Sequence, residues 1–233
     1  MKDWRDTIDA NYTDELEDFY DNSSKKEEFY QKRLGKVTAS NFGKLIVHDK
    51  KNGGYMLSKS QTAQTLIYKI AWERLLASGQ ISSGLGRLDV FSQSLAHGNT
   101  YESEAIDFYQ KQTGREVKDS NMFIAHGDFI GGTPDGFVGE DGLIEVKCPF
   151  NGGNHIRVVL EKTVYNPEYI YQMQGYLWLT KRKWCDFVSY DPDMIDGLKM
   201  AIVRVQRDEE LIEQIEQIIK MVIEKIEQIT KEI

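Results

Sequence analysis

The chain has 233 residues, of which 40% are apolar, and a formal net charge of −8 at pH 7. This apolar content is sufficient for one large domain, and no low-complexity tract, repeat or Pro/Gly-rich linker divides residues 1–233. The two cysteines, Cys148 and Cys185, exclude a disulfide framework, a four-cysteine zinc site and a cysteine-ligated iron–sulfur cluster. We therefore expect a single-domain intracellular protein with reduced thiols.

The negative charge is concentrated at the two ends of the chain. Residues 1–30 carry ten acidic and four basic side chains, residues 207–233 carry eight and four, and residues 31–206 carry 19 and 21. The middle of the chain is therefore compatible with a polyanionic partner. The N-terminal residues MKDWRDTIDA are too polar for a signal peptide, and no apolar run approaches membrane-spanning length. We expect a cytoplasmic protein that does not bind membranes.

The first third of the chain is predicted to be mostly helical. Residues 3–33 are predicted to be helical, so that residues 1–30 form an acidic helical N-terminal segment. A second helix begins near Ser40 and runs through Ile46. An exposed loop is expected from Lys50 to Ser58, because KKNGGYMLS contains two glycines and several polar residues.

Two longer helices are predicted to follow. The first begins after Ser60, ends before Gly79, and has apolar residues at helical spacing: Ala63, Leu66, Ile67, Ile70 and Leu75. The second follows Ser92 and ends near Gly114.

The strands are predicted in the second half of the chain. Residues 115–148 contain short apolar runs separated by turns, and WCDFVSY (184–190) and MAIVRV (200–205) are typical strands. Between them, Asn166-Pro167 is a favourable helix start for a helix through about Thr180.

A long amphipathic helix over about residues 207–233 is predicted to end the chain. Its apolar residues recur at three- and four-residue steps: Leu211, Ile215, Ile218, Val222, Ile226, Ile229 and Ile233. We expect it to pack on its own domain rather than in a coiled coil, because the heptad register drifts after Val222. The predicted fold class is α/β.

Charged residues converge on one predicted hairpin, GGTPDGFVGEDGLIEVKCPF. Residues two apart in a strand face the same way, so Glu145 and Lys147 project together. The turn GEDG places Asp135 across from about Val146, near both charges. The pattern also fits a solvated hairpin with a surface ion pair. However, the flanking residues are apolar, and carboxylates buried among them require a compensating cation or donor.

Two further polar residues are predicted to face this cluster. Glu102 lies in an apolar helix stripe and is therefore expected to point inward; its neighbours are Leu95, Gly98, Ala105, Ile106 and Tyr109. Gln172 lies among large apolar groups in IYQMQGYLW, where an amide has either a structural role or a role at the site.

The cluster suits the metal-dependent hydrolysis of a phosphodiester. Carboxylate oxygens, a carbonyl and waters are the ligands that Mg²⁺ takes in proteins. Such ions polarise the phosphoryl oxygen and lower the pKa of a bound water. Lys147 would position or deprotonate that water and offset charge in the transition state.

Five sequence blocks in one order resemble the phage-type alkaline exonucleases, that is, the lambda exonuclease family and its YqaJ-like viral recombinase nucleases. The blocks are RLGKVTAS (33–40), AHGNTYESEA (96–105), GGTPDGF with GLIEVKCPF (131–150), YQMQGYLW (171–178) and VSYDP (188–192). The resemblance implies a restriction-endonuclease-like core, with a mixed central β-sheet flanked by helices. It also implies the PD-(D/E)xK signature, here Pro134-Asp135 followed by Glu145-Val146-Lys147.

The resemblance further implies a 5'→3' exonuclease that depends on Mg²⁺, with two ions bound and Mn²⁺ as a substitute. It would digest one strand of linear duplex DNA and leave 3' single-stranded tails for phage-type recombination by strand annealing. Asp135, Glu145 and the carbonyl of Val146 are implied metal ligands, Lys147 is the implied catalytic lysine, and Glu102 is the implied helix-borne acid near the metals.

Further roles and partners also follow from the resemblance. Gln172 is the implied active-site glutamine, and Arg33 and Ser40 would hold the terminal 5'-phosphate. Ser40 is also a plausible N-cap, and a helix N-terminus attracts an anion. Ring-shaped trimers are the family's assembly, a single-strand annealing protein is a candidate partner, and the bacterial host cytoplasm is the expected location.

Two other functions are compatible with the same residues. One is a PD-(D/E)xK endonuclease, either a restriction enzyme or a junction resolvase, which has no use for a 5'-phosphate pocket such as Arg33 and Ser40. The other is a non-catalytic DNA-binding module, which would be expected to have lost Asp135, Glu145 or Lys147, although all three are present.

Overall fold

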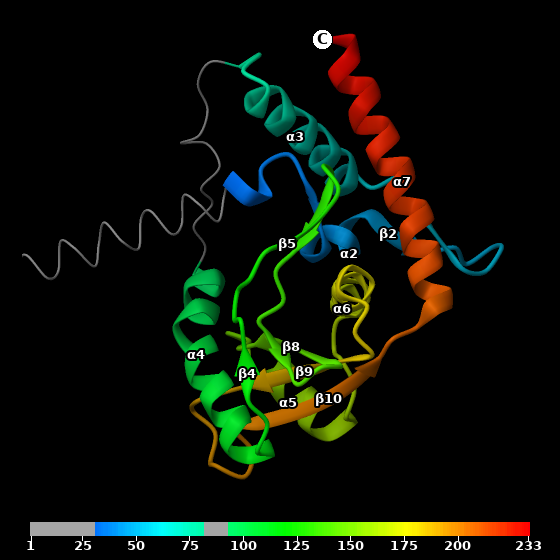
Figure 1. Ribbon diagram of the computed structural model, residues 1–233. Helices are drawn as coiled ribbons and strands as arrows, with labels where there is room; N and C mark the ends of the chain where they lie inside the picture. Colours follow the sequence, from blue (N-terminus) through cyan, green and yellow to red (C-terminus); the bar gives the residue numbers. More distant parts are fainter. Residues whose placement is uncertain (1–30, 82–92) are drawn as a thin grey trace, which may run out of the picture. The chain divides into compact units, whose positions relative to one another are not determined.

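The structure is a computed structural model that describes residues 31–81 and 93–233. The chain divides after Leu34, and every element below belongs to the unit Gly35–Ile233 (Figure 1). Most of the helix predicted over residues 3–33 lies outside the described residues. The expectation of one domain over the whole chain remains a prediction.

Five strands form a mixed central sheet in the order β10-β9-β8-β7-β4. They are β4 (Val117–Lys118), β7 (Gly136–Val138), β8 (Gly142–Lys147), β9 (Trp184–Tyr190) and β10 (Met200–Gln206). Only β8 and β9 are parallel within this sheet. Two small sheets complete the strands: β1 (Val37–Thr38) with β6 (Ile130–Gly132) and β5 (Ile124–His126), and β2 (Ile46–His48) with β3 (Tyr55–Leu57).

Helices cover both faces of the central sheet, as the predicted α/β class requires. The helices are α2 (Phe42–Leu45), α3 (Gln61–Ala77), α4 (Gln93–Thr113), α5 (Gly152–Glu161), α6 (Pro167–Thr180) and α7 (Glu209–Glu232). α4 packs on β8 and β9 from one side, and α6 lies on the other side (Figure 1). The mixed sheet, its flanking helices and the long C-terminal helix confirm the predicted architecture.

Alternate residues of β8 belong to two different apolar clusters. Ile144 and Val146 pack with Ala105 and Tyr109 of α4. Leu143 faces the other way, into the larger cluster that contains the core of α6. Because side chains alternate along a strand, Glu145 and Lys147 share the α6 side with Leu143. This confirms that both charges project from one face.

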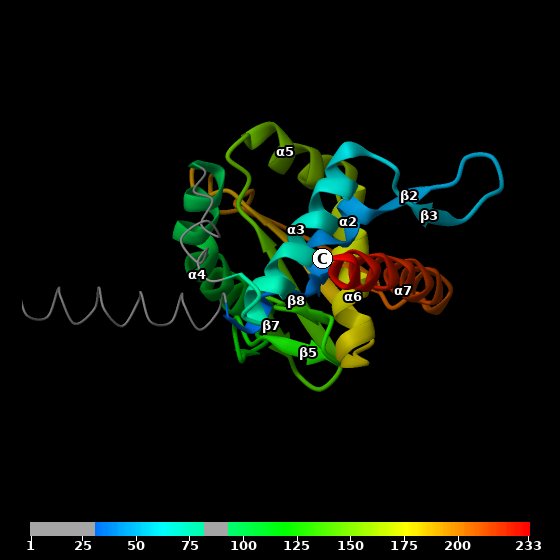
Figure 2. The ribbon, with the colours of Figure 1, turned by 90° about the horizontal axis from the view of Figure 1, so that it is seen from above.

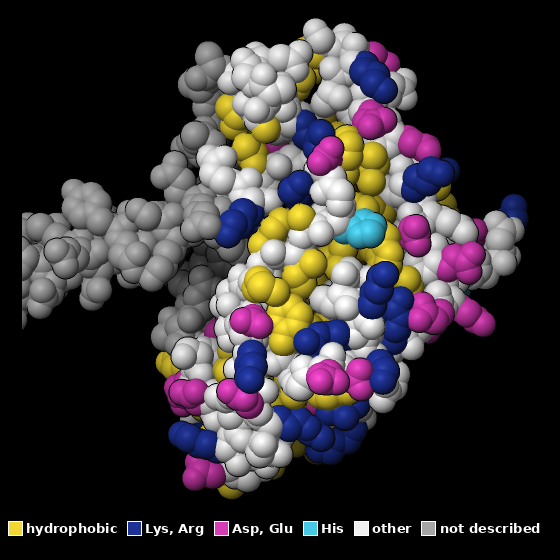
Figure 3. All heavy atoms as spheres, viewed as in Figure 1, with side chains coloured by type: hydrophobic (Ala, Val, Ile, Leu, Met, Phe, Trp, Pro, Cys, Tyr) yellow, Lys and Arg dark blue, Asp and Glu magenta, His cyan; other side chains and the backbone are white. Residues whose placement is uncertain are grey.

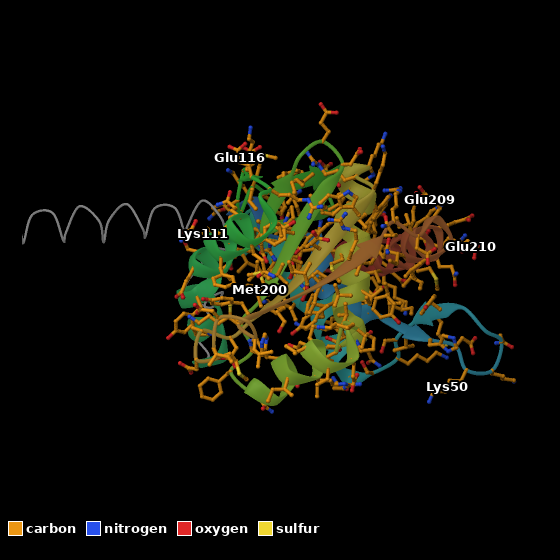
Figure 4. All side chains as sticks on the ribbon, turned by 90° about the horizontal axis from the view of Figure 1, so that it is seen from below. Lys50, Lys111, Glu116, Met200, Glu209 and Glu210 are labelled. Atoms are coloured by element: carbon orange, nitrogen blue, oxygen red, sulfur yellow. The ribbon has the colours of Figure 1, made fainter. Side chains whose placement is uncertain are left out.

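The C-terminal helix packs on its own unit, as predicted. Asp208 caps α7 by accepting a hydrogen bond from the N–H of Leu211 at 3.0 Å. Helix α7 contacts α3, β3 and α6 (Figure 2). The buried apolar residues of α7 belong to the larger apolar cluster. Glu209 and Glu210 lie in the first turn (Figure 4), where carboxylates favour the positive end of the helix dipole.

The predicted helix at Ser40 is shorter than expected. Ser40 lies in a 3-10 turn, η2 (Ala39–Asn41), and α2 ends before Ile46, which begins β2. The residues at the cap positions are Thr38 and Asn41, and neither side chain makes a capping hydrogen bond. The N-cap prediction for Ser40 was therefore wrong.

The predicted loop from Lys50 to Ser58 is also only partly correct. Its second half forms β3, so that β2 and β3 make a hairpin whose loop stands out in Figure 2. Asp49 closes the loop by accepting hydrogen bonds from the N–H groups of Lys51 and Asn52, at 2.9 and 3.1 Å. Gly53 and Gly54 adopt φ of +78° and +73°, which favour glycine.

Surface charge and helix composition relate to the expected DNA partner and to the expected absence of membrane binding. On the face that Figure 3 shows, basic and acidic side chains are interspersed. Among the helices of the described ranges, none combines the length and the apolar character needed to cross a bilayer.

Candidate active site

The β7–β8 hairpin brings Asp135 to the end of β8. Gly136 pairs with Ile144, so the next position places Asp135 opposite Glu145, one residue from the predicted pairing with Val146. Asp135 Oδ2 accepts a hydrogen bond from the N–H of Val146 at 2.6 Å. This bond holds the Asp135 carboxylate beside the strand that carries Glu145 and Lys147.

Glu145 is the centre of the polar cluster. Its side chain is buried, and its Oε1 atom accepts hydrogen bonds from Lys147 Nζ and from Gln172 Nε2, the latter at 2.6 Å. Gln172 Nε2 also donates to the hydroxyl oxygen of Tyr176 at 2.7 Å. The expected convergence of Asp135, Glu145, Lys147 and Gln172 is therefore present.

Burial and mutual repulsion shift the protonation of this cluster. Burial, together with the charge of Glu145, raises the pKa of Asp135 well above its ordinary value. Burial also raises the pKa of Glu145, although the ammonium of Lys147 opposes this shift. Burial disfavours the charged form of Lys147, but Glu145 and Asp135 outweigh it, so the pKa of Lys147 is raised and the ammonium persists.

One oxygen of Glu145 is a candidate ligand for a cation. Among the described residues, Glu145 Oε2 is the buried side-chain polar atom that has no hydrogen-bond partner. An unpartnered carboxylate oxygen is costly to bury, and coordination to a hard cation removes that cost. Glu145, Asp135 and the carbonyl of Val146 are oxygen donors of the kind that such a cation takes, so these residues fit a divalent ion.

Glu102 reaches this region from the α4 side of the sheet. Its charge raises the pKa of both Asp135 and Glu145, and its Oε1 atom accepts a hydrogen bond from Asn121 Nδ2 at 3.3 Å. Within residues 31–81 and 101–233, no three His, Cys, Asp or Glu side chains are grouped closely enough to form a metal site. Glu102 as a third metal ligand therefore stays a proposal.

Two groups of residues near the site were not predicted. Tyr176 and Tyr169 lie four residues after and three residues before Gln172, on the face of α6 that meets the site. Their spacing from Gln172 was a usable signal, because residues three and four apart share a helix face. Helix α5, which includes most of the sequence NGGNHIR (151–157), was not predicted either. Its His155 is buried, and the ring Nδ1 lies 2.9 Å from Ser189 Oγ.

Three further residues that the sequence raises are Arg33, Ser40 and Cys148. Arg33 is half-buried and precedes the unit that contains the site, and Ser40 is exposed with its hydroxyl 3.1 Å from Thr38 Oγ1. Their assignment to a 5'-phosphate remains a prediction. Cys148 belongs to the apolar cluster under α4, and burial raises its pKa to about 12. A buried thiol with a raised pKa is poorly suited to act as a nucleophile, because the thiolate is the reactive form.

Comparison with known proteins gives one family and several solved structures. The sequence pattern of the YqaJ-like viral recombinase domain matches residues 28–183. A comparison with curated protein sequences finds no match.

The solved structures include exonucleases. An alkaline exonuclease from Laribacter hongkongensis superposes with a TM-score of 0.74 and 31% sequence identity, covering 88% of this chain and 94% of that chain. The same enzyme in complex with dAMP gives a TM-score of 0.73 with the same identity and coverage. A phage-related exonuclease from Haemophilus somnus 129PT has a TM-score of 0.63 at 22% identity, covering 84% and 96% of the two chains, and shares the fold.

Proposed function

This chain belongs to the YqaJ-like viral recombinase family of phage-type alkaline exonucleases, and we propose from that premise that it is a nuclease acting on linear duplex DNA. The observation that carries the proposal is the buried cluster of Asp135, Glu145 and Lys147 at the end of β8. The relative from Laribacter hongkongensis has been solved with dAMP, a deoxynucleoside monophosphate. This supports DNA as the polymer that is hydrolysed.

Each residue of the cluster has a distinct role in the proposed reaction. Lys147 presents an ammonium that orients the attacking water and offsets the negative charge that grows on the phosphoryl group. Glu145 holds this ammonium in place, and Gln172 in turn holds Glu145. A lysine suits the position better than a third carboxylate, because it does not repel the phosphate.

The proposed cofactor is Mg²⁺, with two ions bound and Mn²⁺ as a substitute. Asp135, Glu145 and the carbonyl of Val146 would hold it, with Glu102 as a further ligand. When bound, the ion supplies Lewis-acid activation of water and neutralisation of phosphoryl charge.

We expect saturating Mg²⁺ to raise the unfolding temperature of the wild-type protein by several degrees. A ligand that binds only the folded state stabilises it by about 2.7 kcal/mol at a hundredfold excess over Kd. Differential scanning fluorimetry with and without Mg²⁺ measures this shift. Glu145→Gln should lose it, whereas Asp141→Asn, which changes an exposed carboxylate, should keep it. An equal shift of the unfolding temperature in both variants would show that Mg²⁺ does not bind at Glu145.

The proposed direction is 5'→3', with 3' single-stranded tails as the product. Arg33 and Ser40 are the proposed contacts of the terminal 5'-phosphate, Arg33 through a bidentate hydrogen bond. The tails would serve phage-type homologous recombination in the bacterial host cytoplasm, with a single-strand annealing protein as the partner. A trimeric ring around the duplex is the proposed assembly.

The test compares linear and closed circular duplex DNA with Mg²⁺. We expect mononucleotides from linear DNA, early release of a label at the 5' end, late release of a label at the 3' end of the same strand, and an intact circle. The control is heat-denatured protein. Cutting of the circle would instead support a PD-(D/E)xK endonuclease, and no release from either substrate would support a non-catalytic DNA-binding module.

A further inference from the structure

Three aromatic rings line the side of the site where the ammonium of Lys147 lies. Lys147 Nζ is 5.2 Å from the centre of the Tyr169 ring. Tyr169 stacks on Phe187, with ring centres 5.7 Å apart and 26° between the planes. Tyr165 packs edge-on against both rings, at 5.4 and 6.1 Å. The rings form a wall beside the charged pair rather than an isolated contact.

Two elements of the fold, strand β9 and helix α6, position these rings. Phe187 on β9 pairs with Glu145 of β8 in the parallel register, so its ring lies next to the carboxylate that holds Lys147. Tyr169 lies three residues before Gln172 on α6, and both side chains face β8. One helix face thus makes a contact to each charge: Gln172 donates to Glu145, and Tyr169 presents its ring to Lys147.

The Tyr169 ring has the properties required to hold an ammonium. The face of an aromatic ring is negative, so it attracts a cation within about 6 Å of its centre. The ring is also fixed in orientation, because its hydroxyl lies 3.2 Å from that of Tyr165 and its plane rests on Phe187. Unlike a second carboxylate, it attracts Lys147 without adding a full negative charge that would repel a phosphate.

We propose that Tyr169 is a positioning residue for the reaction, and that the face of its ring holds the Lys147 ammonium in the place where it orients the attacking water. This inference rests on the proposed nuclease function. The hydroxyl of Tyr169 serves to orient the ring and takes no part in the chemistry. The side chain therefore acts through Lys147 and makes no contact with the reacting atoms.

The first experiment separates the ring from the hydroxyl by steady-state kinetics on 5'-labelled linear duplex. Tyr169→Leu is expected to lower kcat about tenfold, with KM for DNA unchanged, because it removes the cation–π contact and leaves apolar volume. Tyr169→Phe keeps the ring and should stay within about twofold of wild type. Tyr171→Leu is the matched control, because Tyr171 is a half-buried tyrosine of the same helix that packs on Tyr55.

The second experiment distinguishes positioning from a general structural role. In a Lys147→Ala background, Tyr169→Leu should not lower the residual rate further, because the residue acts through the missing ammonium. An equal loss in both backgrounds would overturn the inference, and so would a Tyr169→Leu enzyme as active as wild type. If the wild-type protein itself releases no nucleotides, the proposed function fails instead.

A third readout does not depend on activity. In the metal-free protein, the ring current of Tyr169 should shift the Lys147 ε-methylene proton resonance upfield, as seen by NMR with selectively labelled lysine. Lys147→Arg identifies the resonance by its disappearance. The shift should persist in Tyr169→Phe and vanish in Tyr169→Leu. A wild-type Lys147 resonance at the ordinary position of an exposed lysine would overturn the contact, even if the leucine variant did not fold.

Discussion

The Lys147→Ala variant is expected to release nucleotides from duplex ends about a thousandfold more slowly than the wild-type protein. Its ammonium is held against Glu145 and Tyr169 at the end of β8. Lys147 is the ion-pair partner of the buried Glu145 carboxylate, so the variant removes this positive charge from the site. Lys147→Arg should recover little of the loss, because the larger planar guanidinium does not fit the geometry of an ammonium.

Quantification of acid-soluble label from 5'-phosphorylated duplex with Mg²⁺ measures this effect. Lys183→Ala is the matched control, since Lys183 also forms an ion pair, with Asp141 at 3.0 Å, but lies on the exposed surface. It should behave as wild type. Binding of the duplex without metal should change only a few-fold in Lys147→Ala. A variant with wild-type turnover would show that Lys147 has no catalytic role.

The Asp186→Ala variant is expected to lose about 3–5 kcal/mol of the free energy of unfolding. The Asp186 side chain is only 1% exposed and accepts two hydrogen bonds from Arg204, at 2.7 and 2.8 Å. Its Oδ2 atom also accepts a hydrogen bond from the hydroxyl of Tyr109 at 2.8 Å. Removal of the carboxylate leaves a guanidinium and a buried hydroxyl without their acceptor.

Urea unfolding followed by circular dichroism measures this loss. The matched control is Asp141→Ala, which breaks an ion pair on the surface and should cost less than about 1 kcal/mol. Because Tyr109 lies on α4, two turns after Glu102, Asp186→Ala should also loosen the helix that carries Glu102. An unfolding free energy within about 1 kcal/mol of wild type would show that the buried pair is easily replaced.

The elements that the sequence predicted best are those with strong local signals. Strand β9 has the predicted bounds of residues 184–190, and α6 begins at Pro167 after the Asn166 cap, as expected. Asn166 accepts a hydrogen bond from the N–H of Glu168 at 3.0 Å. The apolar run of β9 and the Asn-Pro start of α6 are local sequence signals, so these two elements could be predicted without knowledge of tertiary contacts.

Elements that depend on tertiary contacts were missed. Helix α5 begins with Gly152-Gly153, which disfavour a helix, and no helix was predicted there. It is stabilised instead by burial of Val158 and by His155, whose ring contacts Ser189 Oγ and the carbonyl of Leu198. Likewise, the sequence KKNGGYMLS (50–58) has the composition of a loop, but Tyr55–Leu57 form strand β3. Tyr55 packs edge-on against Tyr171, a contact that local sequence does not reveal.

The same division applies to the site. That Glu145 and Lys147 share a face follows from the two-residue period of a strand, and this was predicted. The contacts of Tyr169 and Phe187 depend on which strand and helix lie beside β8, and the sequence alone does not specify those neighbours. The hydroxyl of Tyr109 on Asp186 likewise joins residues 77 positions apart. Such contacts require the topology to be known first.

Strand pairing, rather than the number of residues between Asp135 and Glu145, is what brings these two acids together. Gly136 pairs with Ile144, and the loop at residues 139–141 only closes the ladder. Insertions in that loop would leave the site intact. In contrast, one residue added within β8 before Glu145 would move the side chains of Glu145 and Lys147 to the other face of the sheet. Sequence searches for distant relatives should accordingly allow a loop of any length between the two acidic residues. They should require charged and apolar residues to alternate in the strand that follows the loop.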